Sequence, residues 1–101
     1  MKKGDCATFY LKKLLRKEDS LKDCKHSAML LHFDEKKECI FFLLKSGKLT
    51  ELSLDAIYEC QIETEKGRLD CTGRIKERFR SDLGKIFKFE IENGFYKINL
   101  K

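Results

Sequence analysis

The stretch that decides the fold is Lys85-Ile-Phe-Lys-Phe-Glu-Ile-Glu-Asn-Gly-Phe-Tyr-Lys-Ile-Asn-Leu100. An Asn-Gly pair between alternating apolar runs favours a two-residue type I′ turn, whose central residues need positive φ. With Asn93 and Gly94 in the turn, Phe89 faces Ile98, and the apolar residues of both runs share one face. The stretch therefore predicts an antiparallel hairpin with one buried face.

A second hairpin is expected around Glu65-Lys66-Gly67-Arg68. An even-length loop there sets Thr64 against Leu69 and places the apolar residues of both strands on a shared face. Gly73 lies inside the second of these strands. Glycine in a strand marks a bend or a bulge, which is a usual device for curling a sheet into a barrel.

Further strands are expected upstream. Two short continuous apolar runs, Ala28–Phe33 and Cys39–Leu44, fit central strands that are covered on both faces, with the charged residues 34–38 connecting them. After a turn at Ser46-Gly47, residues Leu49–Leu54 predict another short strand. The upstream half of the chain is thus also predicted to be mainly β.

Residues 5–24 leave two alternatives open. Thr8–Leu11 is typical of a strand, whereas Cys6, Phe9, Tyr10, Leu14 and Leu21 approximate one helical stripe. We expect a leading strand followed by a helical turn capped by Asp19 or Ser20. Residues 1–101 are then one mainly β domain: a small antiparallel barrel or sandwich of about six or seven strands, with a short N-terminal strand or helical turn.

The bulk composition bounds the possible functions. The chain of 101 residues has room for one core, and its net charge of +5 permits an anionic partner such as nucleic acid or a phosphorylated ligand. Its five cysteines are an odd count without a C-x-x-C pair. No signal peptide or apolar run of membrane-spanning length is seen, so we expect a reduced, cytoplasmic chain with free thiols and no membrane insertion.

The most concentrated basic feature is Arg74-Ile-Lys-Glu-Arg78. On a regular strand Arg74, Lys76 and Arg78 project from one face. Three cations in a row can hold phosphate oxygens, and arginine can do so in bidentate fashion. The alternative is a solvated face whose charges keep the sheet from pairing with neighbouring molecules.

Other chemistry finds little support. His26 and His32, together with the cysteines, lack the closely spaced pairs that a structural zinc site needs. No local motif singles out one cysteine as a nucleophile, and no glycine-rich phosphate loop occurs. We therefore expect no catalytic residue, no metal ligand and no cofactor.

The basic segment resembles the R-x-x-x-R element of the PilZ family, with Arg74 and Arg78 at the two arginine positions. Ser81-Asp-Leu-Gly84 is similar to the S-x-x-G of the family's second element, although Phe79 stands where the family has Asp or Asn. The strand succession from Leu52 to Leu100 resembles PilZ-type barrels and the barrel that precedes PilZ in flagellar-brake proteins. The resemblance implies a bacterial regulatory barrel that contacts a protein partner, without an intact motif for the cyclic dinucleotide c-di-GMP.

These observations lead to three hypotheses. The first is a non-enzymatic cytoplasmic β-barrel module, PilZ-like, that binds or regulates a partner protein. The second is an anion-binding barrel that holds a cyclic dinucleotide or a nucleic-acid backbone through Arg74, Lys76 and Arg78. The third is a cysteine-dependent enzyme, which requires one thiol far more reactive than the others. The oligomeric state is left open.

Overall fold

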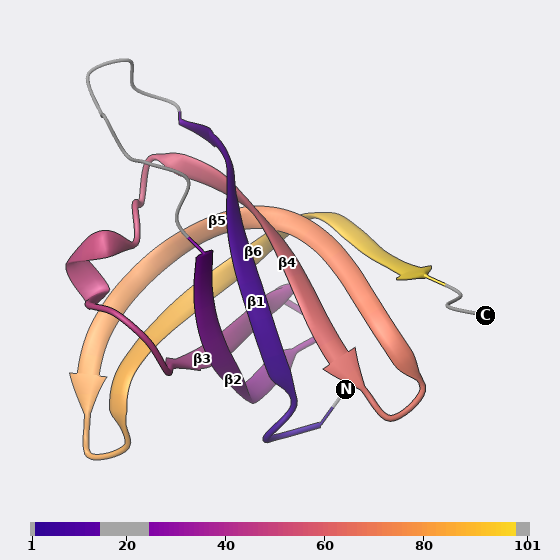
Figure 1. Ribbon diagram of the computed structural model, residues 1–101, viewed down its shortest axis with the longest axis horizontal. Helices are drawn as coiled ribbons and strands as arrows, with labels where there is room; N and C mark the ends of the chain where they lie inside the picture. Colours follow the sequence, from indigo (N-terminus) through magenta and orange to yellow (C-terminus); the bar gives the residue numbers. More distant parts are fainter. Residues whose placement is uncertain (1, 15–24, 99–101) are drawn as a thin grey trace.

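The computed structural model describes residues 2–14 and 25–98, and these form a closed antiparallel barrel (Figure 1). The strands are β1 Cys6–Leu14, β2 Lys25–Asp34, β3 Cys39–Leu44, β4 Ala56–Thr64, β5 Gly67–Ser81 and β6 Gly84–Ile98, with a short 3₁₀ helix η1 at Leu49–Glu51. Their order around the barrel is β1-β2-β3-β6-β5-β4, and β4 closes the barrel by pairing with β1. The predicted mainly β class is confirmed, and the architecture is the barrel with six strands.

The barrel interior is filled by aromatic side chains. Phe9 of β1 lies at the centre, and its ring centroid is 4.8 Å from that of Phe42, 5.1 Å from Phe87 and 5.2 Å from Phe89. All four rings are fully buried, and the three contacts to Phe9 are edge-on, a favoured geometry for aromatic pairs. The barrel is therefore a packed core over the described residues.

The predicted turn at Asn93-Gly94 is wrong. β6 continues through these residues to Ile98 and pairs along its length with β5, and the turn lies instead between Ser81 and Gly84. The register between the two strands shifts on both sides of the pair Thr72–Asn93, so Asn-Gly occupies an irregular part of the ladder. The long pairing with β5 thus replaces the local turn, while the inward face expected for Phe87 and Phe89 is confirmed.

The second predicted hairpin exists, but its register differs. Thr64 pairs with Gly67 rather than Leu69, so the loop holds two residues, Glu65 and Lys66. The displacement is two residues along the partner strand, which preserves the alternation of faces. For this reason Ile62 remains on the buried side, as the hydrophobic pattern predicted.

The predicted irregularity at Gly73 is confirmed. The register of β5 against β6 shifts between Thr72 and Gly73. A Cβ atom at position 73 would lie 2.0 Å from the main-chain oxygen of Glu90, so the two backbones approach too closely for any side chain. Glycine here allows the long β5–β6 ribbon to arch over the barrel (Figure 1).

The strand expected at Leu49–Leu54 is wrong. The segment forms η1 and a bend within the connection 45–55, between β3 and β4. Leu49 and Leu52 are three residues apart, which puts them on one side of a 3₁₀ turn. Leu52 is fully buried and packs in the core, and the main-chain nitrogen of Ser53 donates a hydrogen bond of 2.9 Å to the Tyr58 hydroxyl. The connection 45–55 therefore closes one end of the barrel.

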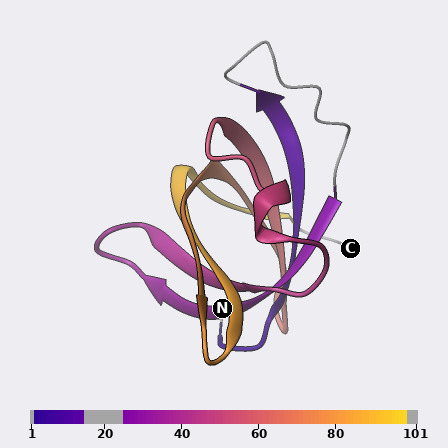
Figure 2. The ribbon, with the colours of Figure 1, turned by 90° about the vertical axis from the view of Figure 1, so that its left-hand side faces the viewer.

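The remaining predictions concern the first half of the chain. The strands at Ala28–Phe33 and Cys39–Leu44 are confirmed as parts of β2 and β3, and the charged connection between them projects from the barrel (Figure 2). The strand alternative is confirmed for β1, whereas the helical turn expected after it lies outside the described residues.

Candidate functional site

The three cations predicted to form an anion site lie on β5, but they do not share a face. Arg74 is opposite the partly exposed Glu90, whereas Arg78 is opposite the buried Phe87. The reason is a bulge around Lys76, where the register between β5 and β6 shifts. One extra residue reverses the alternation of side chains, so the predicted row of three cations is broken.

Two of these cations already face carboxylates. Arg74 Nε lies 2.7 Å from Glu92 Oε2, and Lys76 Nζ lies 3.7 Å from Glu90 Oε1. Both pairs are partly exposed and add little stability, but they neutralise the charge that an anionic ligand would need. This arrangement fits the alternative of a charged strand that resists pairing with neighbours.

The third cation, Arg78, binds main-chain oxygens of the connection 45–55. Its Nη1 donates to the main-chain oxygens of Leu49 at 3.2 Å and Leu52 at 2.6 Å. Lys85, from β6, similarly donates to the main-chain oxygen of Gly47. Arg78 and Lys85 therefore tie the β5–β6 hairpin to the connection 45–55 at the end of the barrel.

A different surface stands out on the outside of the barrel. Six apolar side chains from four neighbouring strands lie on the outer face; we call them the apolar patch: Met29 and Leu31 of β2, Phe41 and Leu43 of β3, Ile86 of β6, and Phe79 of β5. Successive cross-strand pairs Met29–Leu43, Leu43–Ile86 and Ile86–Phe79 make a continuous row. At about 4.8 Å between strands, this row is about 14 Å long.

The apolar patch is half-exposed at its margins and closed at its centre. Ile86 is 5% exposed, whereas Phe79 is 40% exposed. Leu83, in the β5–β6 turn, is 64% exposed, and the adjacent Gly84 lies against Leu43 of the patch. The neighbouring apolar side chains thus cover one another at the centre of the patch, whereas Phe79 protrudes at the β5 end.

Charged side chains surround the apolar patch. Lys45 lies two residues after Leu43, directly after the end of β3, and its main-chain nitrogen still bonds to Ser27 of β2. Its side chain is exposed and has no ion-pair partner among the described residues. Lys25, at the exposed start of β2, is likewise unpaired within residues 2–14 and 25–98. On the opposite side, Lys88 Nζ lies 3.4 Å from Glu77 Oε2. Asp82, which is exposed beside Leu83 in the β5–β6 turn, adds a negative charge at the β5 end, so the excess of positive charge lies on the β2–β3 side of the rim.

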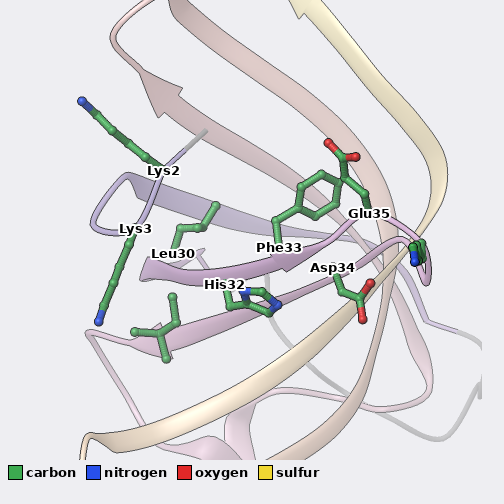
Figure 3. A pocket seen from close by; sticks show the side chains of 9 residues that line it. Lys2, Lys3, Leu30, His32, Phe33, Asp34 and Glu35 are labelled. Atoms are coloured by element: carbon green, nitrogen blue, oxygen red, sulfur yellow. The ribbon is translucent and has the colours of Figure 1, made fainter.

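A groove of about 690 Å³ adjoins the patch along β2 (Figure 3). Leu31 of the patch lines it, together with Lys2, Lys3, His32 and Asp34, among others. In Figure 3, His32 and Asp34 lie on the side of the β2 ribbon opposite Leu30 and Phe33. The groove has both signs of charge and is open, so by itself it does not define a ligand.

The buried cysteines do not form a reactive site. Cys60 and Cys71 face each other across β4 and β5, and both are fully buried. Burial, followed by the hydrogen bond with Cys71, raises the pKa of the Cys60 thiol well above its usual value. Burial also raises the pKa of Cys39. A nucleophilic cysteine needs the opposite shift; Cys24 lies outside the described residues.

The two histidines have different environments. His26 is buried beside the connection 45–55; burial lowers its pKa, and the charge of Glu51 partly opposes this. His32 is exposed on β2. Among the residues that the structure describes, no three His, Cys, Asp or Glu side chains are grouped to hold a metal ion. That part of the chain also contains no helix of the length and apolarity needed to cross a bilayer.

The fold and site thus define a small closed β-barrel with an apolar outer patch. Comparisons with protein-family models, curated proteins and solved structures give no match for this chain.

The apolar patch was missed from the sequence, although part of its signal was present. The continuous apolar runs predicted strands covered on both faces. In the structure the barrel core covers the inner face, whereas Met29, Leu31, Phe41 and Leu43 on the outer face remain half-exposed. The other half of the patch, Phe79 with Ile86, becomes visible only once β5 and β6 are known to follow β3 in the barrel.

Proposed function

We propose that this protein is a non-enzymatic β-barrel module that binds a partner protein through the apolar patch. The observation that carries the proposal is the continuous row from Met29 through Leu43 and Ile86 to Phe79, on the outside of four paired strands. Contiguous exposed apolar surface is uncommon on soluble proteins and marks interaction sites. An apolar centre with a charged rim is also the usual anatomy of a protein interface.

The filled interior supports this choice. Barrels that carry small molecules keep a cavity between their strands, but here the rings of Phe9, Phe42, Phe87 and Phe89 occupy the centre. The surface that is left to perform a function is therefore the outside of the barrel.

Anion binding through Arg74, Lys76 and Arg78 is the weaker proposal. A bound phosphate would compete with Glu92 and Glu90 for the first two cations, and would have to draw Arg78 away from main-chain oxygens. The contacts of these cations favour a barrel that works through protein contact over one that holds a nucleotide.

A PilZ-like regulatory role in the cytoplasm is part of the first proposal. The six-stranded antiparallel barrel is compatible with such a role, and Arg74 and Arg78, the two arginines of the resemblance, are occupied by contacts within the chain. The free thiols of the described cysteines Cys6, Cys39, Cys60 and Cys71 are in keeping with a reducing compartment.

The proposal is tested by quantitative affinity capture from an extract of the source organism. Tagged wild-type protein is compared with Phe79→Asp, which places a charge in the apolar patch, and with Lys66→Asp, a charge change of the exposed β4–β5 turn. We expect a discrete protein to be retained by wild type and Lys66→Asp and lost from Phe79→Asp. Equal retention by all three proteins would contradict the proposal.

A further inference from the structure

We infer that the partner occupies the apolar patch with an amphipathic helix whose apolar stripe is flanked by acidic side chains. This inference rests on the proposed partner-binding function and names the chemistry of the partner. It follows from three properties of the patch: its position on a sheet face, its length and width, and the charge of its rim.

The position of the patch requires contact through side chains. The central strands of the patch, β3 and β6, are each paired on both sides, β3 with β2 and β6, and β6 with β3 and β5. An added strand needs an unpaired edge for its main-chain hydrogen bonds. The pairs of β5 with β4 end at Gly73, so an added strand could pair with residues 74–81, but it would reach only Phe79 of the row. A partner that covers the whole row must therefore lay an apolar surface on the face of the sheet.

The dimensions of the patch fit a short helix. The row from Met29 to Phe79 crosses four strands and is about 14 Å long. Three turns of helix are about 16 Å long and present one apolar side chain per turn or more on the same face. Phe41 lies beside this row, opposite His32 of β2, and Leu31 is the bulged residue between Leu30 and His32; together they widen the apolar surface at the β2–β3 end.

The rim selects the charge of that helix. Lys45 lies beside the row, two residues after Leu43, and Lys25 lies farther out on the same side, with Ser27 between it and Met29; both are exposed and have no ion-pair partner in the described part of the chain. On the other side the carboxylate of Glu77 is already 3.4 Å from Lys88. Acidic side chains that flank an apolar stripe would meet these lysines, whereas basic ones would be repelled.

Two other occupants fit less well. A second copy of the chain would bring an identical lysine rim to the same interface, because a two-fold contact uses the same patch twice. A lipid surface requires a broad set of apolar side chains that reach into the bilayer, but only Phe79 and Leu83 protrude, both at the β5 end, and Ile86 at the centre of the patch is only 5% exposed.

The test is selection from a displayed library of helical peptides with apolar residues fixed at positions i, i+4, i+7 and i+11. The flanking positions are randomised between Glu and Lys. Several weak rim pairs together predict enrichment of Glu over Lys on the order of tenfold with the wild-type protein. The double variant Lys25→Glu, Lys45→Glu should invert this preference, and both Leu43→Asp and Phe79→Asp should abolish enrichment, with circular dichroism and thermal unfolding to verify that each variant is folded.

Enrichment without a Glu preference, enrichment that survives both patch variants, or no enrichment would overturn the inference. So would concentration-dependent dimers that Phe79→Asp dissolves, or flotation with phosphatidylcholine–phosphatidylserine vesicles that the same substitution abolishes. If cellular capture depends on Phe79 but the library shows no acidic preference, the proposed function stands and the helix inference fails. If capture is also independent of Phe79, both fail.

Discussion

Gly73 shows how one residue sets the shape of the barrel. Its backbone lies so close to Glu90 that a Cβ atom would be 2.0 Å from the main-chain oxygen of Glu90 and 3.1 Å from the Cα of Ile91. Backbone atoms cannot yield as the end of a side chain can. The contact therefore has to be relieved by moving β5 away from β6.

We predict that Gly73→Ala lowers the free energy of unfolding by about 2–3 kcal/mol, as an overpacked core position does. The measurement is urea denaturation followed by circular dichroism. Lys66→Ala, at an exposed turn, is the control and should lie within about 0.5 kcal/mol of wild type. Equal stability of Gly73→Ala and wild type would contradict the close approach of β5 and β6 at this position.

His26 predicts a pH dependence of stability. Burial lowers the pKa of His26 in the folded barrel below its ordinary value of 6.5. The unfolded chain therefore binds the proton more readily, so His26 makes the protein less stable as the pH falls below about 6.5. Above that pH the histidine is neutral in both states and this contribution is absent.

We expect His26→Phe, which keeps an aromatic ring at the site, to flatten the pH dependence of unfolding between about pH 7.5 and 5 relative to wild type. Denaturation at a series of pH values provides the comparison, and His32→Phe, at an exposed position, serves as the control. If the wild-type and His26→Phe curves run parallel over this range, burial does not perturb His26.

At the scale of the elements, register is what the sequence could not determine. Alternating apolar residues predicted the buried face of β4, and that of β6 from Phe87 to Ile91, correctly, because the alternation is local. The predicted turns were wrong in position or length. Asn93-Gly94 lies inside β6, and the Glu65-Lys66 loop is shorter than expected. The local preference of Asn-Gly for a turn is outweighed by the twelve residue pairs that β6 forms with β5.

The faces of the basic segment, residues 74–78 of β5, also depend on strand register. Its residues were predicted to share a face because a regular strand alternates strictly. One bulge at Lys76 places Arg78 opposite Phe87 instead, where it contacts the connection 45–55. Glycine marked the irregularity at Gly73, but the bulge at Lys76 has no glycine, so the sequence of β5 alone does not locate it.

We predict that Arg78→Ala loosens the connection 45–55. Two hydrogen bonds from a charged donor are lost, which we expect to cost about 1–2 kcal/mol of stability for this exposed side chain. Hydrogen exchange should become faster in residues 45–55 and remain unchanged in β1. Arg80→Ala, on the same strand and exposed, is the matched control. Comparable exchange in both variants would mean that Arg78 does not hold the connection.

At the scale of the whole molecule, the barrel class could be predicted but the apolar patch could not. Strand-like periodicity and glycine-marked bends are properties of short segments, and they led to a small antiparallel barrel. The patch gathers Met29, Leu43, Ile86 and Phe79 from four strands. Its existence depends on strand order, with β6 and β5 following β3, and on the register of three ladders.

The contacts of the three basic side chains of β5 predict how the protein responds to anions. Because Arg74, Lys76 and Arg78 have separate partners within the chain, c-di-GMP and short oligonucleotides should leave the melting temperature unchanged. A ligand at about 100 times its Kd would add about 2.7 kcal/mol, a shift of several degrees for a domain of this size. A shift that disappears in the double variant Arg74→Ala, Arg78→Ala would favour the anion-binding proposal.

Partner binding by the apolar patch is tested most directly by photo-crosslinking in cells of the source organism. A photoreactive phenylalanine analogue replaces Phe79 in the apolar patch or, as the matched control, Lys66 in the distant β4–β5 turn (Figure 1). If the apolar patch binds a partner protein, position 79 should give a discrete crosslinked protein that is absent from position 66 and is lost when Leu43→Asp is added. Equal crosslinking from both positions, or none from position 79, would contradict it.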